Sequence, residues 1–461
     1  MKKNVCVQGL GFVGAAMATA IALAKNKDNE FLYDVTGVDL DNKIGRNRVN
    51  AINNGNFPFE TTDLNLITAT KKAYKQGNLR ATTDPFVYTL ADIILIDIHL
   101  DIPFRDHEPE LELDSFKNAI ITVAQRMRPD ALVIVETTVP PGTCEKVIVP
   151  LISQCFADRG LDPEKLLLAH SYERVMPGSN YLDSIVNFWR VFSGHTKEAG
   201  DLCEKFLSSI INIDKFPLTR LNSTTASETA KVLENTYRTL NIAFIAEWSR
   251  FAEKIGVDLF QVVEAIQKRP THSNIRYPGL GIGGYCLTKD PTFAPAAARQ
   301  LFGLKIDFPF SRMAVAESAK MPLYAVDKIK QDIGGNLNNR KILLLGASYR
   351  QDVGDTRYSP SEPLYNELVK SGASVDVHDP LVKVWEETNA PILSDLPNLN
   401  DYDALIFAVP HQLYQKLDLT CLLDYKDNIY ILDAFMVFSA AQRDLFKAAG
   451  LNIQTIGVGA V

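Results

Sequence analysis

The sequence predicts an α/β protein in which two doubly wound α/β domains are joined by a central helical domain. In residues 1–215, short apolar segments alternate with longer amphipathic segments, as in a parallel sheet with crossover helices. Residues 216–325 change to long helical patterns. Near residue 340 the strand–helix alternation begins again, so the third domain is expected at residues 326–461.

The first domain contains four apolar segments of strand length with amphipathic segments between them. The expected strands are Asn4–Gln8, Val35–Asp39, Ile93–Ile98 and Leu132–Thr137. The amphipathic segments Ala15–Lys25 and Asp114–Met127 repeat apolar residues at helical spacing.

The second domain is predicted to consist of helices, and the third to contain strands again. Residues Ser223–Lys254 contain neither proline nor glycine, which predicts one long helix, and Leu259–Lys268 and Phe310–Asp332 are further helices. A long helix between two α/β domains is often a dimer surface. The expected strands of the third domain are Lys341–Leu345, Ser374–His378, Ala404–Val409 and Tyr430–Asp433.

Composition excludes several classes of protein. The formal net charge of -7 disfavours a nucleic-acid partner, which normally requires a basic surface. No apolar segment approaches the ~20 residues of a membrane span, and no signal-peptide cleavage pattern is present, so a cytoplasmic location is expected. None of the six cysteines forms a CxxC pair, so neither a metal site nor a disulfide framework is indicated. Five cysteines are expected to be small buried side chains, and Cys286 is the exception.

A glycine-rich motif between the first strand and the first helix predicts a dinucleotide site. The glycines permit a tight turn, a close approach of the pyrophosphate and close helix packing, while the helix N-terminus attracts phosphate. Asp39 ends the next strand and can accept hydrogen bonds from ribose hydroxyls, which favours NAD over NADP. Lys43 and Arg46 weaken that preference. The expected cofactor contacts here are Gly9, Gly11, Phe12, Val13, Gly14, Asp39 and Lys43.

The segment Pro278–Asp290 carries the strongest chemical signal. Its glycines leave backbone N–H groups available to a ligand, and Cys286 follows them directly. Lys289 lies one turn later, and a nearby cation favours the thiolate that acts as a nucleophile. The alternative is a buried cysteine after a glycine-rich turn.

Two further segments carry polar groups that could act on a substrate. Lys231 and Asn235 are four residues apart, so they share one helix face and could bind an oxyanion. Thr138 follows a predicted strand, at the edge where ligands bind in this architecture. Glu173 is a candidate base and Arg174 a candidate partner of phosphate. The alternatives are that Lys231 is a solvated surface lysine and that Glu173 and Arg174 form a surface ion pair.

Taken together and in order, these motifs resemble those of the UDP-glucose/GDP-mannose dehydrogenase family. The resemblance implies an NAD-binding Rossmann domain, a central dimerisation domain and a Rossmann-like UDP-binding domain. The matching motifs are Gly9–Gly14, Leu79–Asp84, Glu136–Thr143, Glu173–Gly178, Lys231 with Asn235, Gly281–Asp290 and Asp352–Pro360.

The resemblance also implies roles for individual residues. Cys286 is the expected nucleophile, Lys231 and Asn235 the oxyanion site, Asp290 and Thr138 the pair that positions a water, and Glu173 the base. Further expected cofactor contacts are Thr138, Lys289 and Arg357. The expected substrate contacts are Glu173, Arg174, Val175, Lys231, Asn235, Tyr277, Gly283 and Arg350, the last at a position where the family usually has lysine.

The Glu173–Gly178 segment is similar to that of the branch acting on UDP-N-acetylhexosamines. The implied reaction is oxidation of the C6 hydroxyl to a carboxylic acid by two hydride transfers to NAD, through a Cys286 thiohemiacetal and thioester. A homodimer and a role in polysaccharide biosynthesis are implied as well. The alternatives are a UDP-glucose 6-dehydrogenase, a single-step NAD-dependent alcohol dehydrogenase and a non-catalytic nucleotide-sugar binding protein.

Besides Arg350, the chain departs from the family pattern at three places. Asp97–Asp101 stands where the family has a Cys-Val-Pro-Thr-Pro-like segment that borders the nicotinamide ribose. Tyr172 and Thr288 each replace a common proline. The departures bear on substrate identity and cofactor affinity, whereas the nucleophile, the oxyanion site and the water-positioning residues are retained.

Overall fold

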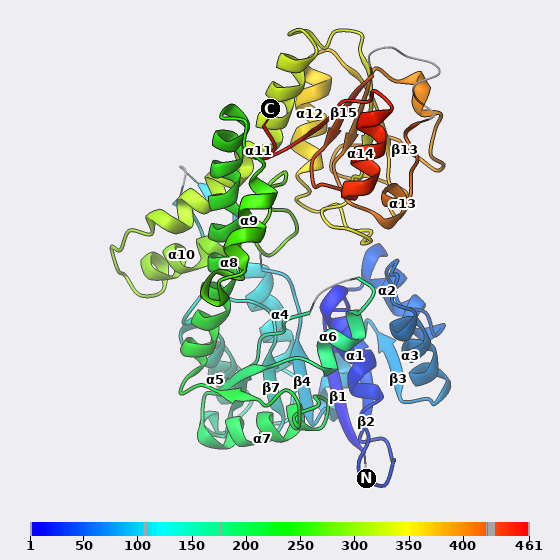
Figure 1. The fold of residues 1–461 in the computed structure, drawn as a ribbon. Coiled ribbons are helices and arrows are strands. Elements are labelled where there is room, and N and C mark those ends of the chain that lie inside the picture. The colour runs from blue at the N-terminus through cyan, green and yellow to red at the C-terminus, as the bar shows by residue number, and fades with distance from the viewer. Residues whose placement is uncertain are drawn as a thin grey trace. The chain divides into compact units, whose positions relative to one another are not determined.

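A computed structural model describes residues 2–100, 102–105, 108–175, 178–420, 422 and 429–459. The chain forms two compact units, one of Met1–Glu234 with Thr292–Asp307 and the other of Asn235–Pro291 with Phe308–Val461. The division between the units, after Glu234, falls within the residues of helix α8 (Thr224–Lys254) (Figure 1). No helix of the described residues is long and apolar enough to cross a membrane.

The first unit contains an eight-stranded sheet in the order β10-β9-β8-β7-β4-β1-β2-β3. All neighbouring strands are parallel except β8 and β9. The strands are β1 (Lys3–Gln8), β2 (Tyr33–Val38), β3 (Leu79–Thr82), β4 (Ile93–Ile96), β7 (Leu132–Val135), β8 (Leu167–His170), β9 (Val191–Gly194) and β10 (Thr219–Arg220), with a separate hairpin of β5 (Phe104–Arg105) and β6 (Glu108–Pro109).

Two hydrophobic cores lie on opposite faces of this sheet, because neighbouring residues of each strand point to opposite faces. Val5 and Val7 belong to the core that contains α1 and α7, whereas Ile94 and Ile96 belong to the core that contains α4 and α5. This is the doubly wound arrangement that the sequence predicts. The helices are α1 (Phe12–Ala22), α2 (Lys43–Asn53), α3 (Leu64–Lys75), α4 (Asp114–Ala124), α5 (Val149–Asp158), α6 (Tyr181–Val186), α7 (Lys197–Ser208) and α10 (Phe293–Gln300).

The second unit contains a six-stranded parallel sheet in the order β13-β12-β11-β14-β15-β16. Its strands also alternate between two cores: Leu344 packs with α11 and α12, and Leu345 packs with α14. Its elements are α9 (Leu259–Gln267), α11 (Pro309–Asp332), β11 (Lys341–Leu345), α12 (Ser361–Lys370), β12 (Ser374–His378), β13 (Ile392–Leu393), β14 (Ala404–Phe407), α13 (Gln412–Gln415), β15 (Tyr430–Asp433), α14 (Ala440–Ala448) and β16 (Ile453–Thr455).

The expected elements are confirmed, with differences at their ends. The first helix begins at Phe12 rather than Ala15, because the chain turns into the helix directly after Gly11. Strand β4 ends at Ile96, two residues earlier than expected. There the Thr137 hydroxyl donates to the carbonyls of Ile96 and Ile98, at 3.1 and 2.9 Å. The three-domain division at residues 215 and 325 stays a prediction.

Candidate active site

The glycine-rich loop between β1 and α1 has the geometry of a dinucleotide cradle. Gly9 has a φ of 96°, and a Cβ there would lie 2.2 Å from the Asp97 carbonyl oxygen. A Cβ on Gly14 would lie 1.9 Å from the Gly9 carbonyl oxygen, so helix and loop pack in direct contact. A Cβ on Gly11 would meet nothing within 4 Å. The backbone is therefore open at Gly11, where the first turn of α1 offers N–H groups to a phosphate.

Asp39, the expected ribose acid, lies directly after β2 and is tied back to this loop. One carboxylate oxygen accepts a hydrogen bond from the Leu10 N–H at 3.2 Å, and the other accepts from the Leu40 N–H at 2.8 Å. Arg48 donates to Asp39 at 3.2 Å, a contact that the sequence did not reveal. Lys43 is exposed at the start of α2. The cradle and the acid fit a dinucleotide with a free ribose hydroxyl.

A buried charge cluster lies where β4 and β7 end. Arg190 donates to the Glu136 carboxylate at 2.5 Å, and the two side chains are 4% and 2% exposed. The Asp97 carboxyl lies within hydrogen-bonding reach of Glu136. Burial, together with the negative charges of Glu136 and Glu173, holds the pKa of Asp97 well above its usual range. The unusual Asp97–Asp101 segment thus begins with a carboxyl whose neutral form is favoured by its surroundings; Asp101 lies outside the described residues.

Thr138 lies half-buried in the loop that follows β7, and a buried glutamate holds that loop against α8. Glu228 accepts hydrogen bonds from the N–H groups of Gly142 and Cys144, at 2.6 and 2.7 Å. Glu228 is fully buried, which raises the pKa of its carboxyl to about 7. Nothing in the local sequence marks Glu228, because its partners lie more than eighty positions away.

Glu173 and Lys231 meet in the first unit. The Lys231 ammonium donates to the Glu173 carbonyl oxygen at 2.8 Å and lies 3.8 Å from its carboxylate. It also lies 5.3 Å from the centre of the Tyr172 ring, which takes part in holding the cation. The Glu173 carboxylate accepts from the Val175 N–H. Tyr172, at a position of the family's proline, is therefore a support of the Lys231 site.

Arg174, the expected phosphate partner, already has partners within the unit. Its guanidinium pairs with Glu234 at 2.8 Å, accompanied by a hydrogen bond to the Tyr172 hydroxyl at 3.2 Å and one to the Trp189 carbonyl at 3.0 Å. A phosphate would have to compete with these contacts. Met176 and Pro177 of the same motif lie outside the described residues.

Cys286 is exposed in the second unit, on a glycine-rich turn. Gly281 and Gly284 have φ angles of 95° and 84°, which disfavour any other residue there. The Cys286 carbonyl accepts from the Asp290 N–H at 2.9 Å, so the acid lies one turn after the thiol. In contrast, Cys6, Cys144 and Cys203 are buried, which raises the pKa values of their thiols. Cys155 is half-buried, and Cys421 lies outside the described residues.

Asp290 is fully buried and is held by two side chains. The Asn235 amide donates to one carboxylate oxygen at 2.6 Å, and the Lys289 ammonium donates to the other at 2.9 Å. Lys289 also lies 4.4 Å from the centre of the Tyr285 ring. The predicted catalytic residues of this unit therefore form one connected set beside Cys286.

The remaining predicted residues of the second unit are Tyr277 and Gly283, before Cys286 in the chain, and Arg350 and Arg357, after it. Arg357 pairs with Asp355 through two hydrogen bonds of 2.9 and 2.7 Å, and it lies 5.4 Å from the Tyr285 ring centre. A Cβ on Gly283 would lie 2.6 Å from Pro360, so this glycine packs against the segment after Arg357. Arg350 is exposed. Tyr277 is half-exposed, stacks on Phe260 at 5.6 Å between ring centres, and donates to Gln267.

Comparison with known proteins places this arrangement among nucleotide-sugar dehydrogenases. The chain is 29% identical to UDP-N-acetyl-D-mannosamine dehydrogenase of Methanocaldococcus jannaschii, over 99% of this chain and 97% of that protein. It is 28% identical to NDP-N-acetyl-D-galactosaminuronic acid dehydrogenase of Ralstonia nicotianae, over 90% of this chain and 92% of that protein.

Solved structures agree in fold. The structure of UDP-D-ManNAc dehydrogenase from Pyrococcus horikoshii matches with a TM-score of 0.82 and 26% identity, covering 99% of this chain and 100% of that one. NDP-N-acetyl-D-galactosaminuronic acid dehydrogenase from Methanosarcina mazei Go1 matches with a TM-score of 0.79 and 26% identity, covering 99% and 96%.

Three family models match in order along the chain. They describe the NAD-binding domain at residues 3–211, the central domain at residues 225–314 and the UDP-binding domain at residues 343–440. The chain therefore belongs to the UDP-glucose/GDP-mannose dehydrogenase family and is an NAD-dependent nucleotide-sugar dehydrogenase.

Proposed function

We propose that the protein oxidises the C6 hydroxyl of a UDP-N-acetylhexosamine to the carboxylic acid, with two molecules of NAD consumed per sugar. The observation that carries this proposal is the exposed thiol of Cys286 one turn before the buried carboxylate of Asp290. An exposed nucleophile next to a fixed base suits a reaction that holds its aldehyde covalently. The names of the Methanocaldococcus and Ralstonia relatives support an N-acetylhexosamine substrate.

The residues of the second unit would begin the reaction. The Asp290 carboxylate, held by Asn235 and Lys289, would remove a proton from the C6 hydroxyl through a water molecule. Bound NAD, held by the glycine-rich cradle, would accept a hydride in each oxidation. The Cys286 thiolate would then bond to the aldehyde carbon and give a thiohemiacetal, whose oxidation leaves a thioester.

Lys231 and Asn235, one turn apart on α8, would stabilise the oxyanions that form at C6. One such donor contributes about 3 kcal/mol in comparable sites. The Glu173 carboxylate lies 3.8 Å from Lys231 and would remove a proton from the water that hydrolyses the thioester. Thr138 and Asp290 would position that water.

The test is the amount of NADH released per mole of limiting sugar, with UDP-N-acetylglucosamine, UDP-N-acetylgalactosamine, UDP-N-acetylmannosamine and UDP-glucose in parallel. Two NADH from an N-acetyl sugar would support both the covalent route and the substrate class. Two from UDP-glucose alone would retain the route and contradict the substrate class. One NADH per sugar would indicate a single-step alcohol dehydrogenase.

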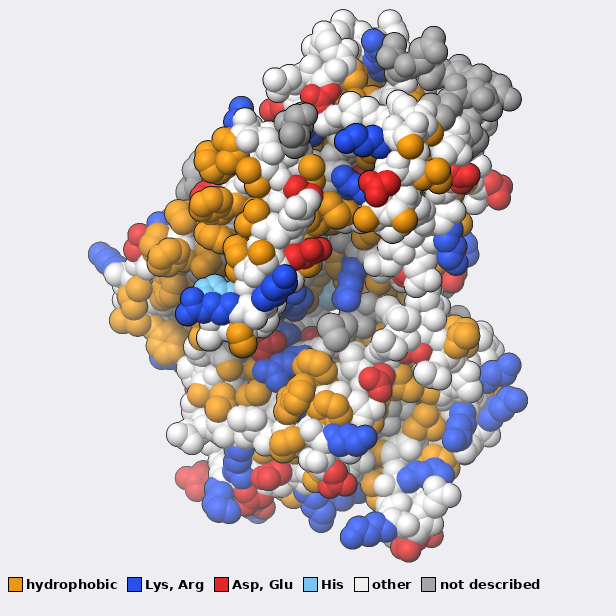
Figure 2. All heavy atoms as spheres, viewed as in Figure 1, with side chains coloured by type: hydrophobic (Ala, Val, Ile, Leu, Met, Phe, Trp, Pro, Cys, Tyr) orange, Lys and Arg blue, Asp and Glu red, His pale blue; other side chains and the backbone are white. Residues whose placement is uncertain are grey.

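We also propose that the protein is a homodimer formed through α8. From Tyr237 to its end this helix exposes apolar side chains at helical spacing, Tyr237, Phe244, Trp248 and Phe251, and the exposed Ile255 follows directly after the helix. Figure 2 shows hydrophobic side chains gathered where α8 lies in Figure 1. An exposed apolar stripe of this length on a single helix suits a second copy of the same helix, since a two-fold axis pairs one surface with itself.

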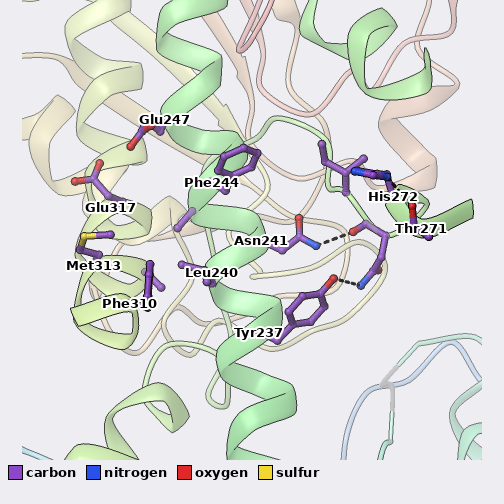
Figure 3. A pocket seen from close by; sticks show the side chains of 14 residues that line it. Tyr237, Leu240, Asn241, Phe244, Glu247, Thr271, His272, Phe310, Met313 and Glu317 are labelled. Atoms are coloured by element: carbon purple, nitrogen blue, oxygen red, sulfur yellow. Dashed lines mark hydrogen bonds between the residues drawn. The ribbon is translucent and has the colours of Figure 1, made fainter. Parts of the chain in front are cut away.

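A groove beside this stripe, with a cavity volume of roughly 540 Å³, would receive side chains of the second copy (Figure 3). Its lining includes Phe310 and Met313 from α11, which are 65% and 52% exposed. The Asn241 amide donates to the Asn274 carbonyl at 2.8 Å, and the Asn274 amide donates to the Tyr237 hydroxyl at 3.3 Å, so its rim is held in place.

Light scattering on the purified protein tests this assembly. The Phe244→Glu variant should shift the mass from dimer to monomer, because it places a charge in the interface. The control is Val384→Glu, at an exposed apolar position far along the chain from α8, which should leave the dimer intact. A monomeric unmodified protein would contradict the proposal.

NAD and a nucleotide sugar as reactants are consistent with a cytoplasmic enzyme that supplies uronic acids for polysaccharide synthesis.

A further inference from the structure

The loop between β11 and α12 carries Arg350 and Arg357, and a buried histidine from another strand holds this loop. His411 follows β14 and is fully buried. Because β11 pairs with both β12 and β14, the carboxyl ends of these three strands lie at one edge of the sheet. In an open parallel sheet this is the edge at which ligands bind.

Both ring nitrogens of His411 contact the loop or its support. Nδ1 lies 2.9 Å from the Asp352 backbone N–H, which can only donate, so Nδ1 accepts. Nε2 therefore carries the proton, and it lies 3.0 Å from the Ser348 hydroxyl and 3.2 Å from the Asp379 carboxylate. The Ser348 hydroxyl in turn lies 3.2 Å from the Arg350 carbonyl, to which it can donate. The imidazole of His411 thus bridges both sides of Arg350.

Asp379, at the end of β12, completes the support. The same carboxylate oxygen that contacts His411 accepts from the N–H groups of Ala347 and Ser348, at 2.9 and 3.0 Å. Asp352 has a φ of 54°, a left-handed conformation that costs a non-glycine residue energy. Its N–H bond to His411 and the bond that its side chain accepts from the Gln412 N–H, at 3.2 Å, compensate for that cost.

We propose that His411 is a positioning residue for uridine nucleotide binding, because it fixes the loop that presents Arg350. This inference rests on the proposed function and on the expectation, drawn from the family resemblance, that Arg350 contacts the UDP-sugar. Arg350 itself is exposed, and its backbone carbonyl lies within hydrogen-bonding distance of the Ser348 hydroxyl that contacts His411. Loss of the imidazole would leave the Asp352 N–H without its acceptor and free the loop, while the dinucleotide cradle, in the other compact unit, would be unaffected.

The test measures binding of UDP and of NAD to the full-length protein by titration calorimetry. The His411→Leu variant should weaken UDP binding by about tenfold, which corresponds to about 1.4 kcal/mol, and leave NAD binding within about twofold. The His411→Asn variant keeps an acceptor near the Nδ1 position and should recover most of the UDP affinity. If His411→Leu does not fold, Ser348→Ala, which removes one link of the same network, should still weaken UDP binding selectively.

His378→Leu is the matched control. His378 is also buried, and it contacts the same Tyr414 ring as His411, but its side chain bonds to the Tyr414 hydroxyl rather than to the loop. This variant should leave UDP affinity unchanged even if its melting temperature falls. Unchanged UDP binding in the His411 and Ser348 variants, or an equal loss in His378→Leu, would overturn the inference. An unmodified protein that binds no UDP would instead overturn the proposed function.

Discussion

Replacing Asp97 by asparagine should make the protein more stable at neutral pH. The buried Oδ2 of Asp97 and Oε2 of Glu136 have no hydrogen-bond donor among the described groups, although the two carboxyls lie within reach of each other. A proton shared between them satisfies both oxygens. Because Arg190 is bound to Glu136 and stabilises its negative charge, we expect the proton to reside on Asp97. An asparagine amide would donate to Glu136 in the same direction without requiring a proton.

The size of the effect follows from proton linkage. Asp97 has a raised pKa in the folded protein, so its contribution to stability is greatest below its ordinary pKa and is lost as the pH rises. While the folded protein retains this proton and the unfolded chain does not, stability falls by about 1.4 kcal/mol per pH unit. From pH 5 to pH 7 the unmodified protein should therefore lose stability relative to the Asp97→Asn variant, by up to about 2.7 kcal/mol if the folded protein retains the proton throughout.

Urea unfolding at pH 5, 6 and 7 measures this difference. Because the chain has two compact units, amide exchange in β4 and β7 should accompany it as a local measure. The control is Asp130→Asn, a carboxylate whose side chain is 72% exposed, which should give a difference independent of pH. A constant difference for Asp97→Asn from pH 5 to pH 7, or a loss of stability at pH 7, would show that Asp97 is ionised and refute the reasoning.

Three other substitutions test separate parts of the site. Cys286→Ala should abolish acid formation, measured by product analysis, and acid at a near-normal rate would contradict a covalent route. Arg190→Met should lower the free energy of unfolding by about 3–5 kcal/mol, because it leaves the Glu136 carboxylate buried without its cation; urea denaturation that shows less than about 1 kcal/mol would mean that Glu136 is neutral. Tyr172→Phe keeps the ring beside Lys231 but removes the hydroxyl that bonds to Glu234 and Arg174. Steady-state kinetics should therefore give a kcat within about threefold of that of the unmodified protein, a change in activation free energy of less than about 1 kcal/mol.

Local patterns were sufficient for much of the fold. Apolar segments of strand length predicted β11, β12 and β15 to the residue. The absence of proline and glycine predicted α8 within one residue. These features depend on neighbours in the chain, so the sequence displays them directly. The ends of strands and helices were predicted less accurately. At β4, for example, the Thr137 side chain, which follows the neighbouring strand β7, bonds to the carbonyl of Ile96, the last residue of β4.

The residues of the site also divide into those that local patterns predicted and those that they did not. The glycine cradle, the Asp39 acid and the Cys286 turn could be predicted, because each lies in a short segment whose spacing reports its chemistry. Arg190, Glu228 and His411 could not, since each has a partner that is distant in the chain and that tertiary packing brings close.

The sequence by itself therefore determined the class of fold, the cofactor motif and the candidate nucleophile of this protein. Only the tertiary structure decided how the charges of the site are balanced. Arg190 meets Glu136 across 54 positions, and His411 meets Ser348 across 63. The physical reason is that burial removes water from these groups, so each must find its partner wherever the packing of the sheets places one.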